Sequence, residues 1–215
     1  MSSLAIRATK QERAARTRGE ILEAAILVFS KHGFLGTSMV QLAKTIRMTP
    51  GALYWHFATK EDLLLASLEE LNGRFLREFE PLNREARGMS AHLQLAFFLE
   101  RTERFFGEHP SYGRFLAMLS ALAPGANERV STAIAAVLEA YAGAVAHLIE
   151  YGQVKTHEFR DDVVPREVGH LLVSAFCGLI VHQGLFGDAM PYVGLAKTLE
   201  HLTLRGITAS VPATP

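Results

Sequence analysis

The chain has 215 residues and 22 basic against 22 acidic side chains, so its formal net charge is zero. A chain without net charge is not, taken as a whole, an obvious nucleic-acid binder. A single cysteine, Cys177, excludes a disulfide framework and favours a reducing compartment.

The charge is unevenly distributed along the chain. Residues 1 to 62 carry nine Lys and Arg against five Asp and Glu, a net of +4, and the remainder carries a net of −4. A basic head on an acidic body orients approach to a polyanion, and this contribution weakens as salt rises. We expect residues 1–16 to form a basic arm that is disordered or only partly ordered without DNA. No apolar signal-peptide core is found there.

The hydrophobic spacing predicts an all-α protein with no convincing strand. The expected helices are 17 to 32, 38 to 46, 49 to 57, 59 to 80, 90 to 107, 110 to 123, 127 to 157, 165 to 187 and 191 to 207. Gly33 is placed to end the first helix, and Thr59 with Asp62 resembles a capping box at the start of the fourth. We therefore expect a head at 17–62, a larger helical body at 63–210 and a mobile tail at 211–215.

Two short helices between residues 38 and 57 carry the strongest functional signal. Apolar residues at the spacing of one helix face form the first of them: Met39, Leu42, Ala43 and Ile46. Thr49, a capping residue, stands directly before Pro50, which suits the first position of a new helix. In that helix Leu53 and Phe57 are expected to face inward. The residues left on or near the outer surface are Gly51, Ala52, Tyr54, Trp55 and His56. This pattern is typical of a recognition helix for a DNA groove.

The same segment resembles the tetracycline-repressor (TetR) family of transcriptional regulators. The shared motifs are Ile-Leu-x-Ala-Ala-x-x-x-Phe from Ile21 to Phe29, Gly33-Phe34-x-Gly36-Thr37-Ser38, Gly51-Ala52-Leu53-Tyr54-Trp55-His56-Phe57 and Lys60-Glu61-Asp62-Leu63-Leu64. They cover roughly a quarter to a third of the chain, in the order and spacing of the family. The rest is compatible with the family in length and helical pattern.

The resemblance implies a set of DNA-binding residues. Thr37, Ser38 and Lys60 would bind phosphates. Thr49, Gly51 and Ala52, with Pro50 at the helix start, would face the major groove. Tyr54 and His56 would bind the DNA backbone, while Trp55 would either contact a phosphate or support the core of the head. Arg47 stands in the turn where the family usually has Gly. A positive φ there would cost roughly 1 kcal/mol, part of which a phosphate contact would offset.

The body is expected to hold a small-molecule effector. Aromatic and polar residues crowd two neighbouring helices and a third: Phe97, Phe98, Phe105, His109, Tyr112, Phe115, Met118 and Tyr141. The alternative is that they form ordinary core. As a pocket, this lining would suit an apolar or amphipathic molecule. The fourth helix runs from Lys60 to Phe79 and could transmit a change in the body to the head.

Residues 168–187 contain no Asp, Glu, Lys or Arg, so the segment is formally a membrane-span candidate. Four glycines and several polar residues interrupt it, and we expect instead that one face packs on the core and another on a second subunit. The predicted dimer residues lie here and in the last helix: Leu171, Ala175, Gly178, Leu179, His182, Leu195, Leu199 and Leu202.

Competing classes of function have less support. The nine histidines never fall three or four residues apart, and the common phosphate-binding and nucleophile motifs are absent, so no metal, cofactor or enzyme activity is predicted. A helical small-molecule carrier or scaffold is the main rival. The sequence therefore predicts a cytoplasmic homodimer that represses transcription from a palindromic operator on double-stranded DNA, and that a small effector releases from it.

Overall fold

The computed structural model of the chain describes residues 3–80, 88–189 and 191–209, and the side chains within these ranges except those of residues 3–11 and 188. These residues are almost entirely helical, and the one bridge pair found among them joins Phe159 to Thr208. The chain divides into two compact units, Met1–Asn72 and Gly73–Pro215. We expected this boundary after residue 62, whereas the first unit extends into the fourth helix.

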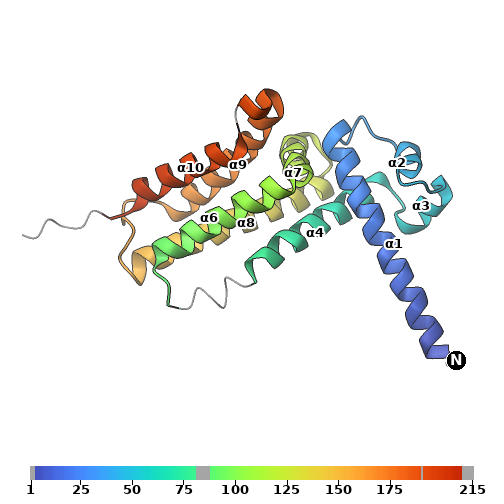
Figure 1. Cartoon of the computed structure of the whole chain (residues 1–215), viewed down its shortest axis with the longest axis horizontal. Helices are drawn as coiled ribbons and strands as arrows, with labels where there is room; N and C mark the ends of the chain where they lie inside the picture. Colours follow the sequence, from blue (N-terminus) through green and yellow to red (C-terminus); the bar gives the residue numbers. More distant parts are fainter. Residues whose placement is uncertain (1–2, 81–87, 190, 210–215) are drawn as a thin grey trace, which may run out of the picture. The chain divides into compact units, whose positions relative to one another are not determined.

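The helices follow one another along the chain as labelled in Figure 1. Their bounds are α1 (Ser3–His32), α2 (Met39–Thr45), α3 (Pro50–His56), α4 (Lys60–Phe79), α6 (Ala91–Glu108), α7 (Pro110–Leu122), α8 (Glu128–Val154), α9 (Pro165–Phe186) and α10 (Tyr192–Ile207). Two short 3₁₀ turns, η1 (Ala123–Gly125) and η2 (Gly187–Ala189), follow α7 and α9. Apart from the start of α1, these bounds lie within about three residues of those expected.

The first unit is built around one face of α1. Ile21, Leu22, Ala25 and Phe29 recur on that face and are almost completely buried. The Gly33 amide donates the last helical bond, to the Phe29 carbonyl at 2.9 Å, and the φ of +72° at Gly33 then turns the chain out of the helix. The connection to α2 also requires Gly36, because a β-carbon there would lie 2.5 Å from the main-chain oxygen of His32.

Helix α1 begins at Ser3, about fourteen residues before the expected start, so the basic segment 3–16 is helical rather than a disordered arm. The first 18 residues contain neither glycine nor proline and include four Ala and four Arg, which favour helix even without burial. Arg16 and Glu20 add an i,i+4 ion pair at 3.0 Å on the exposed side. High helix propensity, rather than an apolar face, therefore extends this helix.

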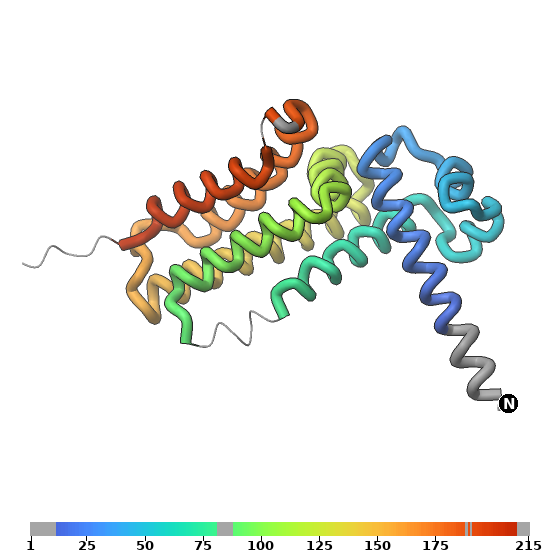
Figure 2. Tube along the Cα trace, viewed as in Figure 1, coloured from blue at the N-terminus to red at the C-terminus, as the bar shows by residue number. Residues whose placement is uncertain are grey.

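The second unit is a bundle of α6 to α10 with the end of α4. Helices α6, α8, α9 and α10 run alongside one another in Figure 2, and α7 packs on α9. The tightest approach is between α8 and α9, where a β-carbon on Gly169 would lie 2.2 Å from the carbonyl oxygen of Ala142. The glycine at this position therefore permits the close crossing.

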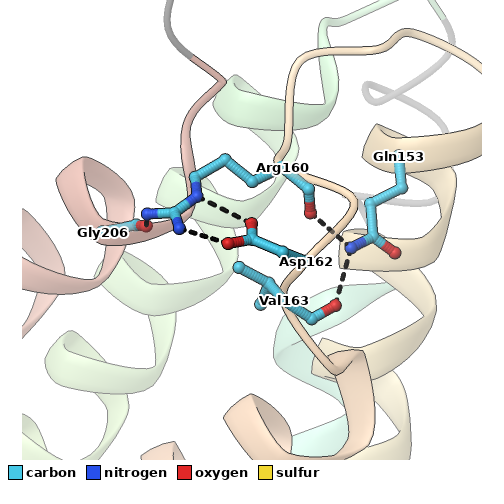
Figure 3. A network of polar contacts seen from close by, with 5 residues as sticks. All are labelled: Gln153, Arg160, Asp162, Val163 and Gly206. Carbon is cyan, nitrogen blue, oxygen red and sulfur yellow. Dashed lines mark hydrogen bonds and ion pairs between the residues drawn. The ribbon is translucent and has the colours of Figure 1, made fainter.

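The connection between α8 and α9 is fastened to the end of α10, as Figure 3 shows. The guanidinium of Arg160 binds both carboxylate oxygens of Asp162 and donates to the Gly206 carbonyl at 3.2 Å. The side chain of Gln153 donates to the carbonyls of Arg160 and Val163 at 2.6 and 2.8 Å. Main-chain bonds from Arg160 to Ile207 and from Ala209 to Glu158 complete the connection. Polar contacts thereby hold the connection between α8 and α9 against the end of α10.

Two helices of this bundle, α8 and α9, are long and apolar enough to cross a membrane when judged by length and composition alone. The two helices also pack against each other within the second unit. Packing against α8 and the rest of the unit therefore accounts for the apolar residues on the buried face of α9, and those on its exposed face remain to be explained.

Candidate functional site

Helix α2 is set in place by a reciprocal capping box. The Ser38 hydroxyl accepts from the Gln41 amide at 3.2 Å, and the Gln41 side chain accepts from the Ser38 amide at 2.8 Å. Met39, Leu42 and Ala43 are buried beneath it. Ser38 itself is exposed, so its hydroxyl can still donate a hydrogen bond outward.

The turn between α2 and α3 takes a left-handed conformation at Arg47, whose φ is +56°. The amide of Met48 donates to the Ala43 carbonyl at 2.9 Å and that of Arg47 to the Lys44 carbonyl at 3.2 Å. This pair of bonds is the Schellman arrangement, in which the residue after the cap is usually glycine. Arg47 therefore has the positive φ for which the sequence analysis expected backbone strain. Its side chain is exposed.

Most side chains of helix α3 that could contact DNA point outward. The Thr49 hydroxyl caps it by accepting from the Ala52 amide at 3.2 Å, and Pro50 occupies the first helical position. Leu53 and Phe57 are buried, as the sequence predicted. The side chains of Tyr54 and Trp55 are 48% and 77% exposed.

The remaining predicted residues of α3 complete this surface. Pro50 and Gly51 are exposed and Ala52 and His56 are half-buried. The imidazole of His56 packs edge-on against the indole of Trp55, with the ring centroids 4.7 Å apart. Because Trp55 is largely exposed, it does not support the core of the head, which was one of its two expected roles.

Two of the predicted phosphate ligands instead bond within the first unit. Thr37 is 4% exposed and its hydroxyl donates to the Gly33 carbonyl at 2.7 Å. The ammonium of Lys60 donates to the carbonyls of Phe34 and Thr37 at 2.8 and 2.9 Å. Both side chains therefore hold the connection between α1 and α2, a role that their sequence positions did not indicate.

The second unit contains a partly open apolar cavity of about 30 Å³, room for one or two water molecules. Five helices contribute its walls: Phe75 of α4, Phe98, Leu99, Thr102 and Phe106 of α6, Leu116 of α7, Tyr141 and Val145 of α8, and Leu172, Val173, Phe176, Cys177 and Ile180 of α9. We refer to this space as the apolar cavity.

Only two of the eight predicted ligand residues, Phe98 and Tyr141, line the apolar cavity. Phe105 and Phe115 are buried in core, and Phe97 lies under the guanidinium of Arg101 at 4.6 Å. Tyr112 is buried with its hydroxyl bonded to Arg74, Met118 is half-buried, and His109 is exposed at the cap of α7. For Phe105 and Phe115 the alternative prediction, that these aromatic residues form ordinary core, is therefore the one that the structure supports.

Most of the cavity wall could not be found by looking for aromatic residues on adjacent helices. Leu172, Val173, Phe176 and Ile180 come from α9, where the sequence signal was an undivided apolar run. The spacing of the buried residues Gly169, Leu172, Phe176 and Ile180 was the signal available, because it marks the face of α9 that points into the unit.

Polar groups at the apolar cavity are few. The hydroxyl of Tyr141 is buried and has no hydrogen-bond partner among the described residues. Burial raises the pKa of that hydroxyl, so it keeps its proton at neutral pH. The Thr102 hydroxyl donates to the Phe98 carbonyl at 2.9 Å, and Cys177 lies 3.6 Å from the Ser120 hydroxyl. Burial also raises the pKa of the Cys177 thiol, which keeps it unreactive.

Helix α9 presents a second, exposed apolar face. Leu171 and Leu185 are 65% and 73% exposed, and Gly178 lies between them at seven-residue intervals on the same face. Of the other predicted dimer residues, His182 and Leu202 are exposed and Ala175, Leu179, Leu195 and Leu199 are half-buried. Val181 and Phe186, which were not predicted, extend the exposed face.

Metal binding has no support within residues 3–80, 88–189 and 191–209. No group of three or more His, Cys, Asp or Glu side chains in these ranges is arranged to hold an ion.

Comparison with known proteins identifies the head. Residues 21–67 match the family model described as bacterial regulatory proteins of the tetR family. The chain is 29% identical over 170 residues to the transcriptional repressor NicS of Pseudomonas putida, covering 78% of this chain and 77% of NicS. It is also 43% identical over 74 residues to the transcriptional regulator AcrR of Shigella flexneri, and this match covers 34% of each chain.

The fold of the whole chain is also shared. A TetR transcriptional regulator from Chloroflexus aurantiacus superposes with a TM-score of 0.76 at 18% identity, covering 93% of this chain and all of that one. A regulator from Saccharomonospora viridis, solved with choline, gives 0.75 at 18% identity over 91% of this chain. The relatives are transcriptional regulators and not enzymes. Residues 21–67 therefore form a head of the tetR family of bacterial regulatory proteins, and the helical body that follows shares the fold of solved TetR regulators.

Proposed function

We propose that this protein is a homodimeric repressor that binds a palindromic operator through α3 and leaves it when a small molecule enters the apolar cavity. The observation that carries the proposal is the outward surface of α3, where a small-residue tip at Gly51 and Ala52 precedes two exposed aromatic residues, Tyr54 and Trp55. Tyrosine and tryptophan side chains combine an apolar ring with a hydrogen-bond donor and are enriched at interfaces, so two adjacent exposed ones favour a partner-binding surface.

The role proposed for each residue of the head follows from whether its side chain is exposed. Thr49, Gly51 and Ala52 at the start of α3 would approach the base edges in the major groove, where small side chains allow close contact. Ser38, Tyr54, Trp55 and His56 would contact phosphates as hydrogen-bond donors, and Arg47 with its positive charge as well. Thr37 and Lys60 support these groups from inside the head, because their polar atoms are already bonded there.

Dimerisation supplies the second head. The exposed face of α9, with Leu171, Val181 and Leu185, is largely apolar over about four helical turns, and Gly178 on it lets another helix approach closely. A second copy covering this face by a two-fold axis would present two α3 helices to the two halves of a palindrome. The relative NicS is named a repressor, which supports this direction of regulation.

The apolar cavity would receive the effector. Its free volume of about 30 Å³ is too small for any molecule beyond a few atoms, so a ligand must displace the walls and thereby favour a different geometry of the body. Phe75 in the wall belongs to α4, which is one continuous helix that begins at Lys60 in the head. Movement of Phe75 would therefore change the geometry of α4 and lower operator affinity.

The test is binding of the purified dimer to DNA from its own upstream region, titrated with salt and with random competitor DNA. We expect a specific complex whose affinity falls at least tenfold in Tyr54→Ala, through loss of a phosphate contact near the groove. Tyr151→Ala is the matched control, because Tyr151 is another partly exposed tyrosine (38%) that lies in the body. Its operator affinity should equal that of the wild type.

Equal affinity for operator and random DNA would contradict the proposal and leave a generic polyanion binder. The rival function, a helical carrier of small molecules, predicts ligand binding without any sequence-specific and salt-sensitive DNA complex. The titration with competitor DNA separates these outcomes directly.

A further inference from the structure

One residue in the wall of the apolar cavity carries a buried polar group without a hydrogen-bond partner among the described residues. Tyr141 is 7% exposed, and its hydroxyl bonds to nothing in the described part of the chain. Leaving a buried hydroxyl unpaired is unfavourable, and such groups in native proteins generally have a ligand or a function. The ring is held in place by Phe75, whose centroid lies 4.6 Å away, so the hydroxyl cannot readily turn towards solvent.

The other wall residues of the apolar cavity determine which ligand charges and polar groups it can accept. No Asp, Glu, Lys, Arg or His belongs to its wall within the described ranges. A charged ligand would lose its hydration there without gaining an opposite charge, which is strongly unfavourable. The hydroxyl of Thr102 already donates to the Phe98 carbonyl, and Cys177 is a weak donor paired with Ser120. Tyr141 is thus the one strong donor that remains available.

We propose that the effector is an uncharged, largely apolar molecule that carries one hydrogen-bond acceptor, such as a ketone or ester oxygen, directed at the Tyr141 hydroxyl. This inference rests on the proposed function of the apolar cavity and specifies the chemistry of its ligand. Neither the proton nor the oxygen lone pairs of the phenol have a partner in the described ranges, and the phenol is a stronger donor than acceptor because its ring delocalises the oxygen lone pair, so the ligand supplies the acceptor. The phenyl and aliphatic walls cover the remainder of the ligand.

Entry of such a molecule requires the rim to move. Phe98 on α6 and Val173 and Cys177 on α9 are half-buried, unlike Leu99 and Leu172 beside them, so they are the wall residues with room to turn outward. An uncharged ligand suits this route, because it need not shed a tightly bound hydration shell as the apolar rim opens.

The experiment uses two pairs of matched probes on the full-length protein without DNA. N-phenyl-1-naphthylamine and 8-anilinonaphthalene-1-sulfonate share one scaffold and differ by a sulfonate, and their fluorescence reports entry into an apolar site. We expect the neutral probe to bind at least tenfold more tightly. Displacement of that probe by 2-acetylnaphthalene and 2-ethylnaphthalene, which differ by one carbonyl oxygen, then tests the acceptor.

The wild type should bind the acetyl compound roughly fivefold more tightly than the ethyl compound, the ratio expected for one hydrogen bond. Tyr141→Phe should remove this preference and leave the affinity for the ethyl compound unchanged. Tyr192→Phe is the matched control, because Tyr192 is a second buried tyrosine (2% exposed) with an unpaired hydroxyl that does not line the cavity. It should keep the wild-type preference.

Three results would overturn the inference. The wild type could bind both naphthalenes equally, Tyr141→Phe could retain the preference, or the anionic probe could bind as tightly as the neutral one. In the last case, loss of that binding in Arg114→Gln would assign an anionic ligand to the neighbouring hollow of about 180 Å³, which Arg114 and Gln183 line. Because all three readouts are made without DNA, they are independent of whether the operator complex forms. A carbonyl preference that depends on Tyr141, without any effect on operator binding, would contradict the proposed release and not this inference.

Discussion

The ammonium of Lys60 donates a hydrogen bond to the main-chain carbonyl of Phe34 at 2.8 Å and lies 4.1 Å from the centre of the same residue's ring. A second bond, to the Thr37 carbonyl, closes the connection between α1 and α2 onto the start of α4. The lysine therefore uses its charge inside the head, at a point where the resemblance implied a phosphate.

Lys60→Met tests this internal role. The methionine keeps an apolar stem of similar length and removes the donors from two part-buried carbonyls, so we expect the free energy of unfolding to fall by about 2–4 kcal/mol. Operator affinity should fall with it, but the slope of log affinity against log salt should stay as in the wild type, because no phosphate contact is lost. Denaturant unfolding and a salt titration measure the two effects. A slope reduced by about one would assign Lys60 to a phosphate instead.

Arg47→Gly separates backbone strain from DNA contact. Relief of the positive φ is worth about 1–2 kcal/mol, and the added freedom of glycine in the unfolded chain offsets roughly 0.5–1 kcal/mol of it. We therefore expect a protein that is slightly more stable and binds its operator more weakly, with a salt slope smaller by about one. Arg47→Lys keeps both the strain and the charge and should match the wild type in both measurements. Unchanged operator affinity in the glycine variant would exclude a role for this side chain on DNA.

Leu185→Glu tests the exposed face of α9. A carboxylate at a position that is 73% exposed costs little in the monomer and cannot be buried against a second copy. We expect sedimentation equilibrium to give a monomer at micromolar concentration, with specific DNA binding lost as a result. Leu93→Glu, at a 56% exposed leucine of α6, should remain dimeric. A dimeric Leu185→Glu protein would place the interface elsewhere.

Gly169→Ala tests the close crossing of α8 and α9. The new methyl would meet the Ala142 carbonyl, which is backbone and cannot turn away, so we expect a loss of about 1–3 kcal/mol in unfolding free energy. Gly107→Ala is the control, because an added methyl on this exposed residue of α6 meets nothing within 4 Å. That variant should be about 0.5–1 kcal/mol more stable than the wild type. An equal change in unfolding free energy in the two variants would mean that helix propensity alone, and not the contact with Ala142, determines the effect.

Glu103→Gln tests a buried carboxylate. Burial raises the pKa of Glu103 above its ordinary value of 4.5, an effect that the nearby charge of Lys197 only partly offsets. Since the folded state binds this proton more tightly than the unfolded state, ionisation removes stability as pH rises above 4.5. Glutamine cannot ionise, so the variant should be more stable than the wild type at pH 7, and the difference should shrink as the pH approaches 4. Urea unfolding at both pH values measures it, and a difference independent of pH would exclude ionisation as the cause.

Local features were predictable because their causes lie within a few residues. The ends of α2 and α3 follow from Thr49, Pro50 and the apolar spacing, and the bonds between Thr59 and Asp62 form the expected capping box. The early start of α1 was missed because the expected start relied on an apolar face, which segment 3–16 lacks, and not on its helix propensity.

The amino-acid sequence by itself determined the all-α class, nearly all the helix bounds and the outward surface of α3, since periodicity, caps and turns act between neighbours in the chain. Only the tertiary structure decided which side chains meet. It turned Lys60 and Thr37 inward, left Trp55 uncovered, and placed Phe98 and Tyr141 at the apolar cavity while burying Phe105 and Phe115 as core. These outcomes depend on contacts between residues far apart in the chain, and the same aromatic side chain fits a core or a cavity wall according to what the opposite helix presents to it.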